Sequence, residues 1–189
     1  MTTQVHYHYH FPAGCTVPAE DVDGKLVRIL SKANPDYYLT ALADGRVVLN
    51  PENSIDPRQQ WIKDESWGLK LEDAAGFPAF ALVNIATGRA LHHGNHENEQ
   101  VTSTVYDKDH LDDDILWSTS QDFGNGYRTI RMYNNICLNL DADHGDKKHG
   151  GIKNGNKLIL YRWLKNHDNQ FWKIVPVCEF DHLHLAEAL

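Results

Sequence analysis

Short runs of β-branched, aliphatic and aromatic residues recur along the middle of the chain, and each run is only three to five residues long. Turns rich in Gly, Asn and Asp separate them, which is typical of β-strands. The pattern predicts strands at 26–29, 38–41, 47–49, 80–83, 90–92, 101–105, 129–132, 137–140 and 158–161. Between residues 24 and 177 no stretch carries the 3.6-residue apolar period of an amphipathic helix. We therefore expect an all-β protein.

Three tryptophans divide this region into copies of one unit. Trp61, Trp117 and Trp172 lie 56 and 55 residues apart, and each closes a similar block of strands. The first and third blocks end in Gln-x-Trp, with Gln59 and Gln170, whereas the second has Ile at that position. Three four-stranded copies can close on themselves as a barrel with a triangular hairpin cap, so we predict a β-trefoil. We expect the three tryptophans to pack in its core.

The repeat also defines the domain organisation. We expect an N-terminal extension at 1–23, one trefoil domain at 24–177 and a C-terminal tail at 178–189. Within the domain, the three pseudo-symmetric repeats are expected at about 24–75, 76–124 and 125–177.

Several local motifs resemble a known family. The Gln-x-Trp endings resemble the ricin-B type of lectin trefoil. A closer resemblance, to the Euonymus lectin (EUL) domain of plants, is carried by KANPDYYL at 32–39, GFPAFALVN at 76–84, GYRTIRM at 126–132, HGDKKHGG at 144–151 and DNQFWKIV at 168–175. The resemblance covers residues 24–177. It implies a carbohydrate-binding domain of the cytoplasm and nucleus, without catalytic activity, of a kind often found in stress-responsive proteins.

Sugar recognition needs an aromatic face for the apolar side of the ring and a few polar groups for its hydroxyls. The third repeat supplies both. A polar residue near the end of strand two, an aromatic residue after strand three and an Asn just before Gln-x-Trp do this in ricin-type sites. The predicted carbohydrate-binding residues are Asp141, Asp143, Trp163 and Asn169, with Asn139 and Gln170 as further candidates.

Three points stay open at this stage. The resembled pattern usually has Asp where this chain has Asn139, so the sequence does not decide which of Asn139, Asp141 and Asp143 contacts the sugar. The two aspartates could instead cap a turn, and Trp163 could cover the end of the barrel. The loop at 143–151 either forms a wall of the site or only shapes the hairpin.

The other two repeats offer poorer sets. The first has Thr40 and Asp44 but places Asn50 near the position of Trp163, so it lacks an obvious stacking ring. The second offers His92, His93, Tyr106 and Asp107. We therefore expect one principal site, with weak affinity for monosaccharides and avidity only through self-association or a multivalent ligand.

The charge of the chain bears on its partners. The net charge is −8, which gives no general attraction to nucleic acids or anionic membranes. Residues 128–173, however, hold nine Lys and Arg against four Asp. An alternative to the lectin hypothesis is therefore that this basic third repeat binds an anionic polymer, such as a sulfated glycan or a nucleic acid.

Other features exclude further classes of function. The N-terminus has neither a basic segment nor an apolar core typical of a secretion signal, and the three cysteines have no paired spacing. His6, His8 and His10 alternate and could bind Zn²⁺ loosely, but the lectin mechanism needs no metal and no cofactor. No motif of a metalloprotease, serine hydrolase or phosphate-binding loop occurs. We expect a non-enzymatic protein.

The expected partners are glycans or glycoproteins. A trefoil that serves only as a protein-binding scaffold is a further alternative. The tail at 178–189 could mediate self-association, for example as a homodimer.

Overall fold

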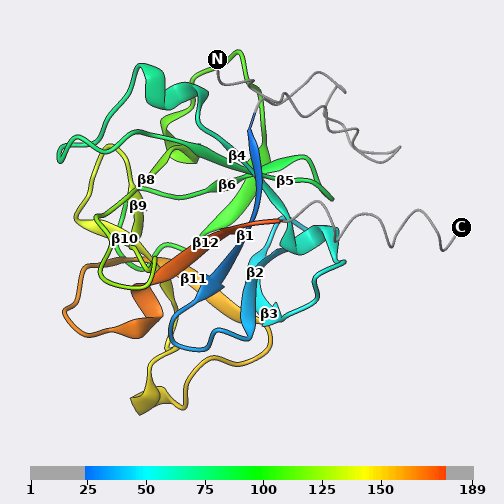
Figure 1. The fold of residues 1–189 in the computed structure, drawn as a ribbon, viewed down its shortest axis with the longest axis vertical. Helices are drawn as coiled ribbons and strands as arrows, with labels where there is room; N and C mark the ends of the chain where they lie inside the picture. Colours follow the sequence, from blue (N-terminus) through cyan, green and yellow to red (C-terminus); the bar gives the residue numbers. More distant parts are fainter. Residues whose placement is uncertain (1–23, 178–189) are drawn as a thin grey trace, which may run out of the picture.

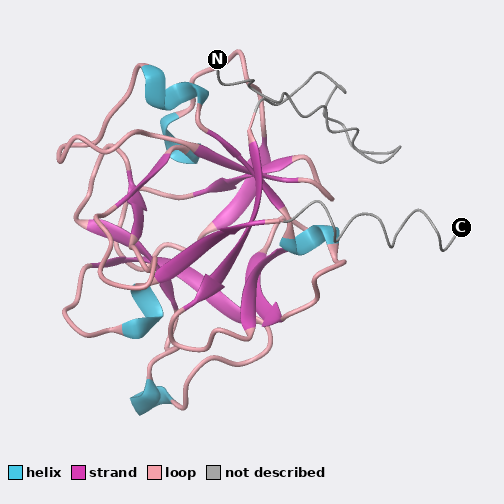
Figure 2. Ribbon diagram, viewed as in Figure 1, coloured by secondary structure: helices cyan, strands magenta, loops and turns pink. Residues whose placement is uncertain are grey.

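The computed structural model describes residues 24–177, which form twelve β-strands and five short 3-10 helices (Figures 1 and 2). The strands are β1 (Lys25–Ser31), β2 (Tyr37–Ala41), β3 (Val47–Pro51), β4 (Trp61–Asp64), β5 (Ala81–Asn84), β6 (Arg89–His92), β7 (Thr102–Val105), β8 (Trp117–Thr119), β9 (Ile130–Met132), β10 (Leu138–Ala142), β11 (Asn156–Arg162) and β12 (Trp172–Pro176). The 3-10 helices are η1 (Pro57–Gln59), η2 (Ser66–Leu69), η3 (Asp113–Ile115), η4 (Lys147–His149) and η5 (Asp168–Gln170).

The all-β prediction is confirmed, and each of the nine short apolar runs lies on a strand. The three remaining strands, β4, β8 and β12, each begin at one of the repeated tryptophans. Within residues 24–177, no helix is long and apolar enough to span a membrane.

The strands pair antiparallel and close on themselves. The first strand, β1, pairs with both β4 and β12, and its register with β12 runs from Val27 opposite Pro176 to Ser31 opposite Trp172. The second and third strands of each repeat form a hairpin, β2–β3, β6–β7 and β10–β11. A barrel closed by its first and last strands and three hairpins from three repeats make up a β-trefoil, as predicted.

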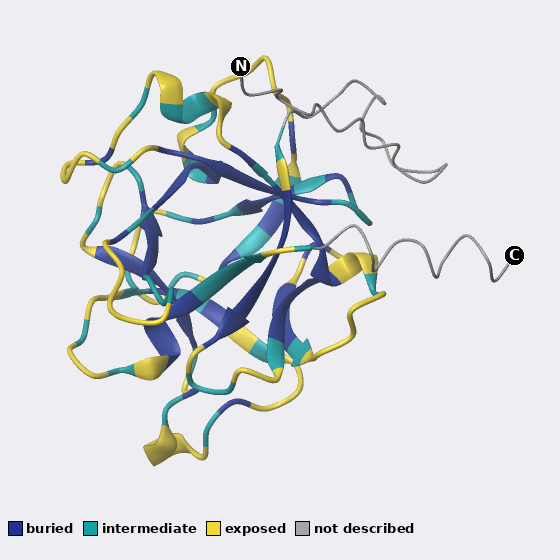
Figure 3. Cartoon of the chain, in the orientation of Figure 1, coloured by how far each residue is buried: buried dark blue, intermediate teal, exposed yellow. Residues whose placement is uncertain are grey.

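The three tryptophans lie at the centre of the barrel, as expected. Each is at most 1% exposed, and all three belong to one cluster of buried core residues. Figure 3 shows that the buried residues are concentrated on the strands. Each indole N–H donates to a backbone carbonyl of the second strand of its own repeat: Trp61 to Leu39 at 3.1 Å, Trp117 to Leu91 at 3.0 Å and Trp172 to Leu140 at 2.9 Å. Because a buried N–H needs a partner, each bond fixes the tryptophan against the hairpin of its own repeat in the same way.

Candidate functional site

A cavity of about 240 Å³ lies in the third repeat, beside the β10–β11 hairpin. Its walls come from that hairpin, from the loop that joins the two strands, and from the turn that carries η5. Asp141, Asp143, Tyr161 and Asn169 line it, and Asn98 reaches it from the second repeat.

The register of the hairpin decides which side chains face the cavity. Asp141 lies opposite Ile159, and Asn139 lies opposite Tyr161. Directly opposed residues of an antiparallel pair project from the same face, so these four share one side of the hairpin. The alternate residues, such as Leu140 and Leu160, are fully buried and belong to the barrel core. Along both strands, residues on the cavity side therefore alternate with residues that face the barrel core.

The carboxylate of Asp141 is held in place by two amides. Asn169 donates its amide N–H to Oδ1 at 2.9 Å, and Gln170 donates to Oδ2 at 2.9 Å. Asn169 and Gln170 both belong to η5, so this single helical turn fixes the orientation of the Asp141 carboxylate. Asp141 is only 5% exposed, yet it lines the cavity. It is therefore a preoriented acceptor at the cavity wall.

Burial raises the pKa of the Asp141 carboxyl to about 7. The amide hydrogen bonds from Gln170 and Asn169 favour the charged form and oppose this shift, while the negative charges of Asp143 and Asp146 add to it. The acid therefore changes its charge near neutral pH.

Asn169 also presents an unused acceptor. Its amide nitrogen bonds Asp141 and, at 3.2 Å, the backbone carbonyl of Ala142. Its Oδ1 atom is buried, and no group within residues 24–177 donates to it. A buried acceptor without a donor is uncommon in folded proteins and marks a place for a ligand group or a water.

Tyr161, which was not among the site residues predicted from the sequence, provides the aromatic ring of this cavity. Tyr161 lines the cavity, whereas Trp163 is not among the lining residues. Trp163 follows the end of β11, donates its backbone N–H to Cys137 O at 3.3 Å and is 45% exposed. Tyr161 could have been found from the β10–β11 pairing, because it lies two positions from Asp141 across the hairpin.

The structure brings Asp141, Asp143 and Asn169 together and sets two other candidates behind them. Asn139 is 1% exposed, and its amide donates to the carbonyl of Cys137 at 3.4 Å. Gln170 is fully buried. Besides Asp141, it donates to Arg162 O at 2.8 Å and accepts from the backbone N–H of Leu164 at 2.8 Å. Gln170 thus ties the end of β11 to the site.

The loop at 143–151 forms one wall of the cavity through Asp143, His144, Asp146 and His149. Asp146 caps η4 by accepting from two backbone N–H groups, and its other oxygen lies 2.6 Å from His149 Nδ1. The hydrogen bond from His149 lowers the pKa of Asp146. His144 lies 2.8 Å from Asp143 Oδ1, and its ring packs edge-to-face on His149 at 4.6 Å. The loop is therefore ordered by its own polar contacts.

The second repeat adds Asn98 to the opposite wall. The backbone N–H of Asn98 donates to Leu160 O at 2.8 Å, and Leu160 donates back to Glu99 O at 2.9 Å. This pairing fixes the segment against β11. Asn98 has a left-handed backbone with φ of 71° and an exposed side chain.

The equivalent positions of the other repeats carry different chemistry. Their alignment follows from the tryptophan hydrogen bonds and the hairpin registers. In the order Asp141, Tyr161, Asn169, the first repeat has Thr40, Asn50 and Arg58, and the second has His92, Thr104 and Asp114. Two earlier candidates of the second repeat are core residues, because His93 is fully buried and Tyr106 is 4% exposed.

Within residues 24–177, no cluster of three or more His, Cys, Asp or Glu side chains could hold a metal ion. His6, His8 and His10, together with the tail at 178–189, lie outside the described residues.

No family model matches the sequence. Comparison with curated proteins finds the ricin B-like lectin R40G3 of Oryza sativa subsp. japonica, 46% identical over 163 residues, which are 86% of this chain and 77% of the rice protein. The ricin B-like lectin EULS3 of Arabidopsis thaliana is 50% identical over 150 residues, which are 79% of this chain but only 47% of that protein.

Among solved structures, the Macrolepiota procera ricin B-like lectin in complex with lactose superposes with a TM-score of 0.61 at 17% identity. The match covers 81% of this chain and 96% of that one. It supports the β-trefoil fold.

Proposed function

The chain belongs to the ricin B-like lectins of the EUL type, and we propose that its third repeat binds glycans, without cleaving them, in the cavity formed by Asp141, Tyr161 and Asn169. The names of its relatives support the carbohydrate-binding and non-catalytic parts of this proposal. The geometry of the third repeat supports the location.

One observation carries the location. Asp141 and Asn169 present adjacent acceptors at the wall of one cavity, and the Oδ1 atom of Asn169 has no donor among the described residues. Neighbouring hydroxyls on a sugar ring are paired donors that match such a set. Tyr161 adds an aromatic face for the apolar side of the ring. Neither other repeat combines a carboxylate, an amide and an aromatic ring at these positions.

The test compares two aromatic residues of the same segment. We expect Tyr161→Ala to weaken glycan binding about tenfold or more, since the ring loses a buried apolar contact. Trp163→Ala, in which an aromatic residue outside the cavity is truncated, serves as the matched variant and should bind like the parent. Binding is measured on a glycan array and then by calorimetry with the strongest neutral hit.

The opposite result would move the site. If Trp163→Ala abolishes binding while Tyr161→Ala does not, the sugar stacks at the end of β11, as the sequence motif alone predicts. Mass spectrometry of the glycan recovered after binding checks that it is unchanged; a cleaved product would contradict the non-catalytic part of the proposal.

A further inference from the structure

A second and larger cavity, of about 400 Å³, adjoins the proposed sugar site. Asp146 and His167 line both cavities, so the two share a wall. The second cavity lies between the loop at 143–151, the turn before η5 and the β1–β2 turn at Ala33. In Figure 1 these three segments lie together at the lower part of the molecule.

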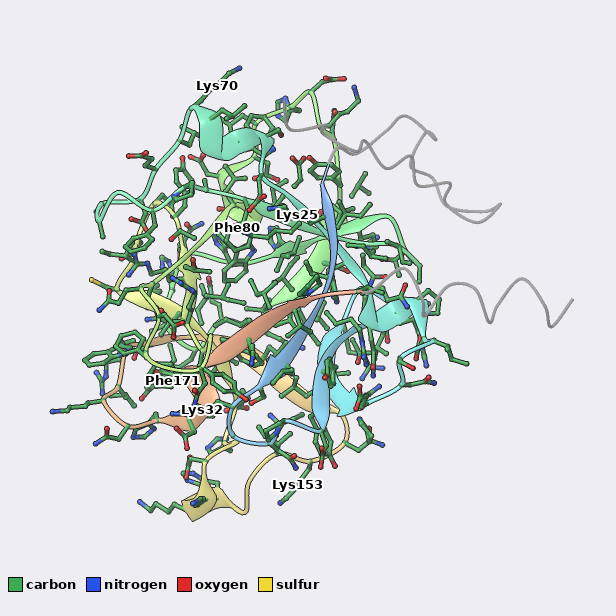
Figure 4. All side chains as sticks on the ribbon, in the orientation of Figure 1. Lys25, Lys32, Lys70, Phe80, Lys153 and Phe171 are labelled. Carbon is green, nitrogen blue, oxygen red and sulfur yellow. The ribbon has the colours of Figure 1, made fainter. Side chains whose placement is uncertain are left out.

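The two carboxylates of the second cavity are already engaged. Asp146 accepts from the backbone of η4 and pairs with His149, as described above. Asp168 forms an ion pair of 2.9 Å with Lys32, which lies in turn over the ring of Phe171 (Figure 4). Both negative charges therefore have partners within the protein.

The two lysines of the same cavity are not engaged. Lys147 and Lys148 line it from η4, and both are exposed. No carboxylate within residues 24–177 pairs with either ammonium group. Lys32, Lys147 and Lys148 carry three positive charges against the two negative charges of Asp146 and Asp168. The hollow therefore has an excess of positive charge, and it attracts an anion.

The first cavity, by contrast, is lined by acidic side chains. Asp141, Asp143 and Asp146 line it, so an anionic substituent there would meet three acidic side chains. A ligand that fills both cavities therefore places a neutral sugar near Asp141 and its anionic group near the lysines.

We propose that the second cavity binds an anionic group, a carboxylate or a sulfate, on the sugar next to the one held at Asp141. This inference rests on the proposed function and specifies its ligand class as an acidic oligosaccharide of at least two sugars. The shared wall of Asp146 and His167 joins the two subsites.

The test uses an array on which each neutral oligosaccharide has a sulfated and a uronic-acid counterpart. We expect the parent protein to prefer an acidic counterpart of its best neutral glycan about fivefold, or about 1 kcal/mol, because two exposed charge pairs each contribute only weakly. The sulfated and uronic counterparts distinguish which anion is preferred. The preference should fall as salt is raised.

Two double variants isolate the lysines. Lys147→Ala with Lys148→Ala should abolish the acidic preference and leave neutral binding unchanged. Lys25→Ala with Lys70→Ala removes the same charge from two exposed lysines that line neither cavity and should preserve the preference (Figure 4 labels both lysines).

Four outcomes would overturn the inference, and each can be told apart from the others. Neutral binding without any acidic preference contradicts the second subsite but not the proposed function. An equal loss of preference in both double variants shows a diffuse charge effect. Acidic binding that survives Tyr161→Ala shows an anion site independent of the sugar cavity, and a protein that binds no glycan contradicts both proposals.

Discussion

At the scale of single residues, Asp141 combines two properties that usually exclude one another. It is nearly buried, which disfavours its charge, yet two amides hold both of its oxygens as acceptors. The result is a pKa of about 7, so near neutral pH a substantial fraction of the molecules carries a protonated acid.

We expect glycan binding to strengthen as pH rises from about 6 to about 8, with a midpoint near 7, because the charged carboxylate is the better acceptor for sugar hydroxyls. Calorimetry over this range with one neutral glycan measures it. Other titratable side chains line the cavity: Asp143, His144, Asp146, His149 and His167. Asp141→Asn is therefore the control, and the part of the pH dependence that it removes belongs to Asp141. If parent and variant show the same pH profile, the pH dependence of glycan binding does not come from Asp141.

The raised pKa of Asp141 also makes the stability of the fold depend on pH, in the opposite direction to glycan binding. The folded pKa lies above the usual value of an unfolded aspartate, so the folded state binds the proton more tightly. The contribution of Asp141 to the free energy of unfolding is therefore greatest in acid and falls as pH rises toward about 7.

At the scale of elements, the cavity of the proposed site has walls from two repeats. The segment at 98–101 pairs with β11 and carries Asn98 to the cavity. The β10–β11 hairpin alone would lack this wall.

We expect Asn98→Gly to weaken glycan binding about fivefold, which corresponds to one lost hydrogen bond of about 1 kcal/mol. Glycine keeps the left-handed backbone at this position, so the thermal midpoint should stay within a few degrees of the parent value. Asn125→Gly is the matched control, since Asn125 is also exposed with a positive φ of 56° and lies on another hairpin. Unchanged binding in Asn98→Gly would remove Asn98 from the site.

At the scale of the whole molecule, threefold symmetry of the fold coexists with asymmetry of the surface. The three core tryptophans make the same hydrogen bond in each repeat. Core packing constrains the inward residues, whereas the outward positions differ freely among the repeats. Tyr161 and Asn169 thus have no counterpart of the same chemistry.

We expect one glycan to bind per chain in a calorimetric titration. Tyr161→Ala should weaken that binding without exposing a second class of site. A stoichiometry of two per chain would show that the second repeat also binds.

The sequence by itself determined the fold, and it pointed to the third repeat, where the proposed site lies. Strand-length apolar runs and the spacing of Trp61, Trp117 and Trp172 are local or periodic signals, and they are enough to specify a closed threefold barrel. The segment just before Trp172 was likewise informative, since Asn169 lies in a family motif. Asp141 and Asp143 were recognised because alternate residues of a strand share one face.

Only the tertiary structure decided which aromatic ring joins them and what else lines the cavity. Tyr161 lies on the same side of the hairpin as Asp141 because of the register between β10 and β11, and Trp163 does not line the cavity because it lies beyond the end of that pairing. Asn98 reaches the site across more than forty positions of sequence. The ion pair between Asp168 and Lys32 likewise depends on side-chain packing between separate segments. Such contacts join residues that are distant along the chain, and no local pattern of a single sequence records them.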